Sequence, residues 1–229
     1  MIKSRTSLKL PGSESGAYID DPLALGSAVL TKLRTQYMGL TYPFAVFGRR
    51  VSIHYSADIR RSSCNRICIG DSVYIAAQTW LNIPEPALGA PPAIIVGNGC
   101  RIGRRCMISA KTRVQLGEDV LLGPSVLITD HSHEFSNPNM PIHMQGLTAG
   151  GSVYIEKNCW LGHGSVVVGA SGDVIIGQNS VIGANSVVTQ SVPQFSVVVG
   201  SPARVIRHFD PASGNWVKGR TVRDVTDEA

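Results

Sequence analysis

Through the middle of the chain an aliphatic residue recurs every six positions, commonly followed by Gly and, at the fifth place of the unit, by a small or branched residue. From residue 67 onward the unit reads IGDSVY at 69–74, IGRRCM at 102–107, LGPSVL at 122–127 and IGANSV at 182–187. A period of six fits neither the turn of a helix nor the two-residue alternation of a strand. It predicts a solenoid in which each unit supplies one short strand and one corner, and three units close a triangular coil.

The repeat also assigns the core. The aliphatic residue of each unit should point inward and stack on its equivalents in neighbouring coils, while the Gly occupies a corner where a missing Cβ permits unusual dihedrals. The fifth position points inward near a corner and accepts small side chains, and Cys100, Cys106 and Cys159 fall on it. We expect these cysteines to be buried, reduced and unreactive. For Cys64 and Cys68 a disulfide or metal role is not expected in a reducing compartment.

Segments of other kinds flank the repeats. A helix over 22–38 is predicted by Leu25, Val29, Leu33 and Tyr37 at four-residue steps. This amphipathic helix is expected to pack across the end of the solenoid or onto a neighbouring subunit. The expected organisation is an N-terminal extension with leading strands over 1–66, the solenoid over 67–207 with loops at 81–93 and 131–151, and a polar tail over 208–229.

Composition supports an all-β chain with many tight turns. Aromatic residues make up 6% and Gly contributes 24 residues, a pairing that disfavours a helical bundle. The net charge of +5 comes from scattered basic residues and short pairs such as Arg104-Arg105, without a nucleic-acid recognition motif. Such pairs would serve a phosphate-rich small ligand equally well. Neither a membrane span nor a secretory signal is recognised, so a cytoplasmic location is expected.

The longest break in the repeat carries the candidate chemistry. After LLGPSVLIT the frame is interrupted by DHSHEFSNPNMPIHMQGLTAGG (130–151) and resumes at SVYIEKNCWLG. A solenoid tolerates insertions at its corners, and a long insertion with concentrated polar groups usually carries function. This one opens with Asp130, His131 and His133 within four residues.

With these motifs in view, the chain resembles the hexapeptide-repeat acyltransferases, and within them the sugar O-acetyltransferases of the maltose, galactoside and polysaccharide type. The resemblance rests on the repeats, on ITDH (128–131), on CWLG (159–162) and on VVGSPARVI (198–206). It implies a single-stranded, left-handed parallel β-helix that assembles as a homotrimer with active sites between subunits. It also implies acetyl-CoA as co-substrate and no metal.

The resemblance assigns roles residue by residue. His131 takes the place of the catalytic base, with His133 in reserve, and Asp130 or Glu134 would orient its imidazole. The family's acceptor-binding Asn corresponds to Ser109, so the acceptor is expected to differ from simple disaccharides, with His133 and Glu134 as further acceptor contacts. The residues that correspond to coenzyme contacts are Trp160, His163, Ala184, Thr189 and Arg204.

The function implied is transfer of acetyl from acetyl-CoA to a hydroxyl of a sugar, glycolipid or polysaccharide precursor. A hydroxyl is a poor nucleophile near neutral pH, and imidazole titrates in the range needed to accept its proton. Alternatives within the class are N-acetylation of a nucleotide-linked amino sugar, or of an antibiotic. A zinc carbonic-anhydrase-like enzyme would need a triad of His ligands, a series that His131, His133, His143 and His163 do not show. A non-catalytic trimer is the remaining alternative.

Overall fold

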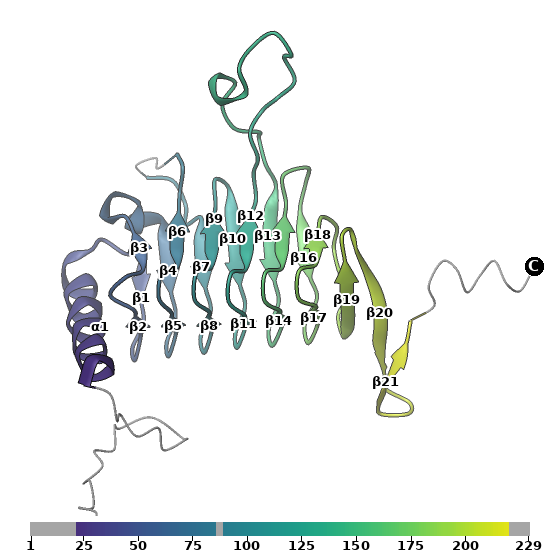
Figure 1. The fold of residues 1–229 in the computed structure, drawn as a ribbon, viewed down its shortest axis with the longest axis horizontal. Helices are drawn as coiled ribbons and strands as arrows, with labels where there is room; N and C mark the ends of the chain where they lie inside the picture. Colours follow the sequence, from purple (N-terminus) through teal and green to yellow (C-terminus); the bar gives the residue numbers. More distant parts are fainter. Residues whose placement is uncertain (1–21, 86–88, 220–229) are drawn as a thin grey trace, which may run out of the picture.

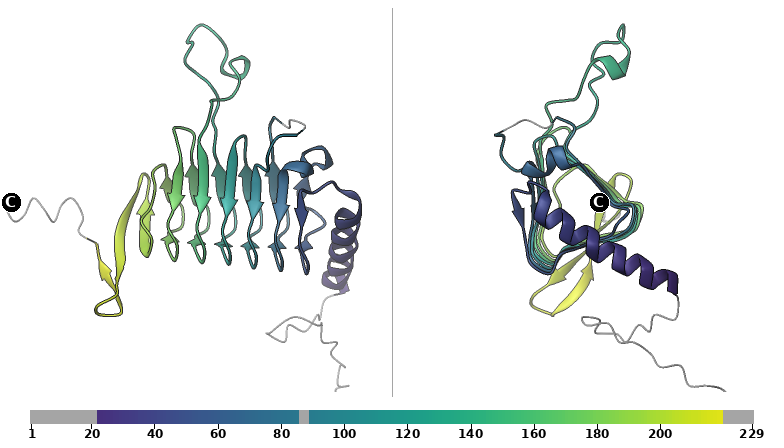
Figure 2. Two further views of the ribbon diagram at one scale, coloured as in Figure 1. Left: turned by 180° about the vertical axis from the view of Figure 1, so that it is seen from behind. Right: turned by 90° about the vertical axis from the view of Figure 1, so that its left-hand side faces the viewer.

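The computed structural model describes residues 22–85 and 89–219, and these form a left-handed β-helix of triangular cross-section (Figures 1 and 2). Each coil contributes one short strand to each of three sheets, here named A, B and C, and the strands pair in parallel from coil to coil. Sheets A and C each contain six such strands, which correspond to six coils. The solenoid predicted from the six-residue period is confirmed.

Chain order runs repeatedly from sheet A to sheet B to sheet C. Sheet A contains β1 (Val46–Phe47), β4 (Ile67–Ile69), β7 (Ile94–Val96), β10 (Arg113–Leu116), β13 (Ser152–Ile155) and β16 (Val174–Ile176). Sheet B contains β2 (Ser52–Ile53), β5 (Tyr74–Ile75), β8 (Arg101–Ile102), β11 (Leu121–Leu122), β14 (Trp160–Leu161), β17 (Val181–Ile182), β19 (Ser196–Gly200), β20 (Ala203–Asp210) and β21 (Asn215–Lys218). Sheet C contains β3 (Asp58–Ile59), β6 (Trp80–Asn82), β9 (Met107–Ser109), β12 (Leu127–Thr129), β15 (Val166–Val168) and β18 (Val187–Val188).

The inward side chains form ladders along the axis. In sheet A, one aliphatic residue of each successive coil pairs in register with the next, and all are buried: Ile69, Val96, Leu116, Ile155 and Ile176. Each burial of an aliphatic side chain of this size contributes about 1.5–3 kcal/mol. Because a coil alone leaves this surface open to water, the coils are stable only as a stack.

Small residues are required where corners meet along the axis. A Cβ on Gly97 would lie 2.5 Å from the carbonyl oxygen of Gly117 in the next coil. The three cysteines of the fifth position are buried, as predicted, and the Cys100 thiol donates to the Gly117 carbonyl at 3.0 Å. Burial raises the pKa of the Cys100 thiol to about 11, and likewise that of Cys159 to about 11. These thiols stay protonated near neutral pH and are poor nucleophiles.

Helix α1 (Pro22–Thr41) crosses the N-terminal end of the coils (Figure 2). It is three residues longer than predicted, and it packs on β2 through Thr35 and Met38, both buried. The Thr35 hydroxyl donates to the Ile53 carbonyl and accepts from the Ile53 N–H. The apolar residues that signalled the helix point elsewhere and are 47–60% exposed: Leu25, Val29, Leu33 and Tyr37. Packing of this apolar stripe across the end of its own solenoid is therefore not observed.

Both ends of the solenoid extend beyond the recognisable repeats. The first coil begins with β1, before the first six-residue unit, and a 3-10 helix η1 (Arg61–Arg66) leads into β4. At the other end β19, β20 and β21 pair antiparallel, so strand structure continues to Lys218 within the segment expected as a polar tail. A hairpin alternates with period two, so a search for six-residue units does not register it. Residues 220–229 of that tail lie outside the described residues.

The Gly97→Ala substitution tests the corner packing. Overlap of the new Cβ with the Gly117 backbone should lower the free energy of unfolding by about 1–3 kcal/mol or more. Gly26→Ala in α1 is the matched control, because a Cβ there meets no atom within 4 Å. Removing a helical glycine should leave stability unchanged or raise it by up to about 1 kcal/mol. Urea unfolding measures both, and equal stability of the two variants would contradict the packing model.

Candidate active site

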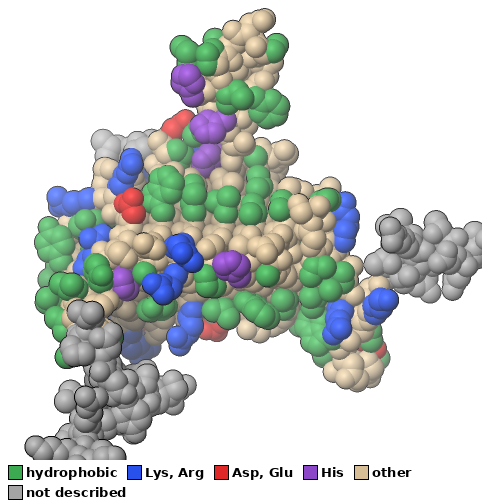
Figure 3. Space-filling view, in the orientation of Figure 1, with side chains coloured by type: hydrophobic (Ala, Val, Ile, Leu, Met, Phe, Trp, Pro, Cys, Tyr) green, Lys and Arg blue, Asp and Glu red, His purple; other side chains and the backbone are tan. Residues whose placement is uncertain are grey.

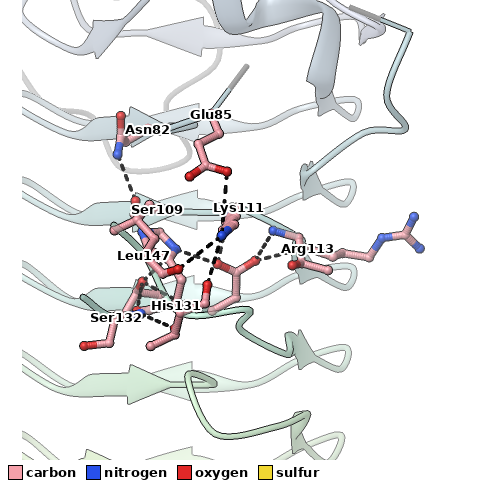
Figure 4. Close-up of polar contacts among 12 residues, drawn as sticks. Asn82, Glu85, Ser109, Lys111, Arg113, His131, Ser132 and Leu147 are labelled. Atoms are coloured by element: carbon pink, nitrogen blue, oxygen red, sulfur yellow. Dashed lines mark hydrogen bonds and ion pairs between the residues drawn. The ribbon is translucent and has the colours of Figure 1, made fainter. Parts of the chain in front are cut away.

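His131 lies at the corner where the chain leaves sheet C after β12, and its neighbour Asp130 holds it. The buried Asp130 carboxylate accepts hydrogen bonds from the backbone N–H groups of Lys111 (2.9 Å), Thr112 (2.7 Å) and Arg113 (2.6 Å) (Figure 4). Its Oδ1 also lies 2.7 Å from His131 Nδ1. The turn in the preceding coil and the imidazole therefore share one carboxylate.

The charge of Asp130 fixes the tautomer of His131. Burial alone would raise the pKa of the Asp130 carboxyl, but the hydrogen bonds from His131 and the three backbone N–H groups hold it below the usual value of 3.8. An ionised carboxylate can only accept, so His131 Nδ1 must carry the shared proton. In the neutral imidazole, Nε2 then keeps its lone pair. The His131 side chain is 10% exposed, as suits a base that meets a substrate at a corner.

The excursion forms an arm that projects from the body (Figure 1). Its root is a short antiparallel pair in which Thr148 N–H donates to the Ser132 carbonyl at 2.9 Å and Ser132 N–H donates to Thr148 Oγ1 at 3.0 Å. Gly150 closes the root with φ +75°, where a Cβ would lie 2.5 Å from the Asp130 carbonyl oxygen. Only Gly permits this approach, which keeps the return strand against Asp130 and His131.

The arm exposes apolar side chains at its free end. Figure 3 shows hydrophobic atoms gathered there, and four large apolar residues are 42–70% exposed: Phe135, Met140, Ile142 and Met144. The last two belong to the 3-10 helix η2 (Ile142–Met144). Exposed apolar clusters of this kind mark surfaces that meet another molecule.

Lys111 and Arg66 tie three loops together, a role that the sequence did not indicate. Lys111 Nζ donates to the Thr148 carbonyl at 3.0 Å and lies 3.6 Å from the Glu85 carboxylate (Figure 4). The buried Arg66 guanidinium donates to the backbone carbonyls of Glu85, Pro91 and Lys111. These contacts attach the 81–93 loop and the arm root to the turn that holds Asp130. Bonds from side chains to loop carbonyls leave no sequence pattern by which they could be found.

A row of polar side chains follows the C-terminal ends of the sheet C strands. Asn82, Ser109 and Thr129 pair in register in successive coils, and Asn82 Nδ2 donates to Ser109 Oγ at 2.9 Å. The Thr129 hydroxyl donates to the carbonyl of His131 at 3.0 Å. Ser109 therefore lies one coil from Thr129, which precedes His131 by two residues. Asn82 was missed in the sequence because the Pro-rich loop separates its coil from the next.

Two of the predicted coenzyme residues line one pocket. Thr189, directly after β18, and Arg204, in β20, face a cavity of about 170 Å³ that is also lined by Val192 and Val198. Thr189 lies at the same edge of sheet C as His131, in a later coil. The pocket and the candidate base therefore share one edge of the solenoid.

Of the other predicted coenzyme residues, Trp160 lies in sheet B, and His163 and Ala184 lie at the edge of sheet C opposite His131. Trp160 opens β14 in sheet B and is half exposed, and His163 and Ala184 are exposed at the corner between sheets B and C. His163 and Ala184 are neighbours along the axis, since the Asn185 N–H donates to the His163 carbonyl at 2.9 Å. One chain thus carries the predicted site residues as two groups, separated by the width of sheet C.

The remaining candidates belong to the arm. His133 is exposed and pairs with Leu147 across the root. The Glu134 carboxylate accepts from the N–H groups of Phe135 and Ser136, which lower the pKa of its carboxyl, and it makes no bond to His131. Between Asp130 and Glu134, the structure thus places only Asp130 against the imidazole. Within residues 22–85 and 89–219, no three His, Cys, Asp or Glu side chains gather as metal ligands. None of the helices in that part of the chain combines the length and apolar character of a membrane span.

A left-handed solenoid of six-residue units, interrupted at one corner by a histidine-bearing arm, defines a hexapeptide-repeat protein. The model of the hexapeptide repeat of succinyl-transferase matches residues 93–129, 152–190 and 173–203. Over these residues the chain carries the repeat of the hexapeptide-repeat acyltransferases.

Relatives of the chain include named acetyltransferases. A protein of Escherichia coli K12 named for O-acetyl transfer in lipopolysaccharide biosynthesis, WbbJ, is 36% identical over 118 residues, which is 48% of this chain and 58% of that protein. The galactoside O-acetyltransferase of the same organism is 32% identical over 145 residues, 58% of this chain and 66% of that enzyme. The chain thus spans less than two thirds of the length of these curated relatives.

A solved structure shares the fold. The N-acyltransferase AntD of Bacillus cereus, in complex with dTDP and 3-hydroxybutyryl-CoA, superposes with a TM-score of 0.61 at 20% identity, over 86% of this chain and 92% of that chain. At this identity the likeness establishes the architecture alone.

The Asp130→Asn substitution should cost stability in a pH-dependent way. At pH 7 a neutral amide oxygen replaces a carboxylate with four donors, and we expect a loss of about 1.5–3 kcal/mol in the free energy of unfolding. The pKa of Asp130 in the folded protein lies below 3.8, so its contribution is present above that pH and is lost as pH falls through the folded-state value.

Urea unfolding of wild type and variant at a series of pH values between about 7 and 3 measures this difference. The difference in free energy of unfolding between wild type and Asp130→Asn should become smaller below pH 3.8. Glu134→Gln is the control, because the Gln oxygen can still accept from the turn N–H groups that Glu134 binds. If the stability difference between wild type and Asp130→Asn stays constant with pH, Asp130 is not an ionised carboxylate held by hydrogen bonds.

Proposed function

We propose that this protein is an acetyl-CoA-dependent O-acetyltransferase, with a hydroxyl of a sugar, glycolipid or polysaccharide precursor as acceptor. The single observation that carries the proposal is the contact of 2.7 Å between Asp130 and His131 at the root of the arm. An imidazole held by a buried carboxylate, with Nε2 free to accept a proton, is the arrangement that general-base catalysis requires. The O-acetyltransferase relatives, although matched over part of their length, support the same chemistry.

In the proposed reaction His131 Nε2 removes the proton of the acceptor hydroxyl as its oxygen attacks the thioester carbonyl carbon. The carbon–sulfur bond of the tetrahedral intermediate then breaks, and the imidazolium gives its proton to the departing thiolate. The ester and the free thiol are the products, so protons balance without a covalent acetyl-enzyme. Asp130 acts as a positioning residue that holds Nδ1 and stabilises the transient imidazolium. The five cysteines have no part, consistent with free thiols of which four are buried.

Coenzyme binding is proposed along the coils that follow His131. The pocket with Thr189 and Arg204 would receive the phosphate-bearing end, because a guanidinium matches phosphate geometry. Trp160, His163 and Ala184 would line the pantetheine. Ser109, one coil before Thr129 in register, would contact the acceptor, supported by the amide of Asn82. His133 and Glu134 on the arm are further acceptor contacts in this proposal.

The two groups of site residues lead to a proposal of a homotrimer with active sites between subunits. In one chain His131 lies at one edge of sheet C, whereas His163 and Ala184 lie at the other edge and Trp160 in sheet B. A single substrate pair therefore meets both groups only if two copies place unlike edges together. The exposed apolar tip of the arm supports contact with a neighbouring copy. A cytoplasmic location is proposed because acetyl-CoA is the donor and all five cysteines are free.

The reaction is tested by thiol release from acetyl-CoA in the presence of a panel of sugars and amino sugars. His131→Ala should lower acceptor-dependent release by about 10²–10⁴-fold, the usual contribution of a general base. His133→Ala is the matched comparison: it should leave kcat largely unchanged and raise only the KM for the acceptor, which His133 is proposed to contact. Loss in His133→Ala with retention in His131→Ala would move the base to His133. Release of the acetyl product by mild alkali identifies an ester, whereas a resistant product is an amide and supports N-acetylation.

Subunit complementation tests the shared site. His131→Ala and Ala184→Trp each damage one group of residues, and the exposed position of Ala184 accommodates the bulk without repacking the coil. Mixed trimers made by co-expression in equal amounts should regain about one quarter of wild-type sites, since each site draws its two halves from different chains at random. If both variant chains fold and assemble into mixed trimers but the trimers have no activity, the whole site lies within one chain.

A further inference from the structure

Three arginines lie close together in the third coil and have no partner of their own. Arg101 belongs to β8, and Arg104 and Arg105 form the corner that follows it. All three are exposed, and within the described residues their side chains take part in no hydrogen bond or ion pair. We name Arg101, Arg104 and Arg105 the arginine corner.

The four-residue corners at the edge that carries the arginine corner contain no carboxylate, and Asp58, which opens β3 at this edge, lies two strands away from Met107 in register. The corners between sheets B and C read HYSA, AAQT, GRRC, GPSV, GHGS and GANS from the first coil to the sixth, without Asp or Glu. The charge acts on its surroundings: burial first, and the charge of Arg104 second, lower the pKa of His54 in the first coil. Arginines that repel one another and form no ion pair within the described residues are suited to bind an external anion.

The backbone conformation at this corner makes arginine unfavourable there in free energy, in addition to the charge repulsion. Arg105 has a φ of 57°, in the left-handed region. The equivalent corner positions in later coils hold Ser125, Gly164 and Asn185, which are smaller. A left-handed conformation costs an ordinary side chain roughly 1 kcal/mol or more relative to Gly. Arginine here gains nothing from packing, since the side chain is exposed.

The position of the arginine corner along the axis separates it from the proposed coenzyme site. The proposed coenzyme contacts lie in the fifth and sixth coils and in β20, while His131 ends the fourth coil. Arg101 pairs in register with Leu121, and Leu121 pairs with Trp160, so Arg101 lies two strands from Trp160, or roughly 10 Å at about 4.8 Å per strand. It lies in the same coil as Ser109, which is proposed to contact the acceptor.

We infer that the acceptor carries an anionic group, a phosphate, a diphosphate or a carboxylate, which the arginine corner of one copy binds beside the Ser109 and His131 of its neighbour. This inference rests on the proposed function and on its shared site. Guanidinium groups bind phosphate and carboxylate through paired, charge-assisted hydrogen bonds, which a neutral sugar cannot provide. The arginine corner would thereby select charged sugars, such as sugar phosphates, nucleotide-linked sugars or uronic acids.

The test compares matched acceptors with the same sugar ring: galactose, galactose 1-phosphate, UDP-galactose and galacturonic acid. We expect kcat/KM for at least one anionic member to exceed that for galactose by about 10- to 100-fold, the value of one or two charge-assisted contacts. The double variant Arg101→Gln/Arg104→Gln should remove this preference and leave the KM for acetyl-CoA within about twofold. Lys157→Gln, an exposed cation between sheets A and B, is the control and should change neither constant.

Direct binding keeps the test independent of the sugar chosen. UDP and galacturonate are titrated by calorimetry into protein saturated with coenzyme A, so that the coenzyme site is already filled. The inference is supported if a probe binds wild type and His131→Ala with equal affinity and binds the arginine double variant with an affinity lower by about 10-fold or more. UDP binding without galacturonate binding identifies the anion as phosphate, and the converse identifies a carboxylate.

Opposite results overturn the inference in distinct ways. A preference for galactose, or binding of neither anionic probe, contradicts an anionic acceptor. An increase in the KM for acetyl-CoA in the double variant assigns the arginines to the coenzyme. If coenzyme A itself does not bind to wild type, the proposed function fails first, and with it the inference.

Discussion

Contact between equivalent side chains in successive coils is the interaction on which the rest of the structure depends. Each strand is only two to four residues long over most of the solenoid, too short to be stable alone. Ladders such as Val96, Leu116 and Ile155 bury a continuous core, and glycine corners such as Gly97 let the coils approach closely enough to pair. Because the spacing between coils is then fixed by backbone hydrogen bonds, every residue at an edge has a defined position along the axis. The candidate site is built from such edge positions.

Asp130 joins this scaffold to the chemistry. Its carboxylate satisfies three backbone N–H groups of the preceding turn that would otherwise be left without partners, and it also holds the His131 imidazole. A substitution there would change folding stability and, in the proposed mechanism, catalysis as well, so stability is measured beside activity. The contacts of Lys111 and Arg66 extend the same turn to the 81–93 loop and to the arm. Three loop segments are thus fixed to one another at this corner, which suits the proposed site, where a base must be held within a narrow range of positions.

The periodic part of the structure could be predicted from the sequence because the residue types within each six-residue unit determine where its strand and its corner lie. The buried cysteines and the inward aliphatic residues follow from the frame, and so does the break at Asp130. Contacts that depend on how loops meet could not be predicted, and Arg66 and Lys111 show why: their partners are backbone carbonyls, which every residue possesses. The apolar stripe of α1 predicted the helix but not the face that packs, because Thr35 and Met38 contact the first coil instead. Spacing along the chain also did not show that His131 lies at one edge of sheet C and that His163 and Ala184 lie at the other.

The arm leaves and rejoins the solenoid at nearly the same point, since the Gly151 N–H donates to the Asp130 carbonyl at 3.0 Å. The coils on either side therefore keep their register whatever the length or composition of the residues between them. Proteins built in this way can differ over the whole tip of the arm, including Phe135 and Met144, while the packing of their coils stays the same. An insertion held at its root by a few backbone hydrogen bonds, among them those of Gly151 and Thr148, is a segment whose sequence can change while the fold stays the same.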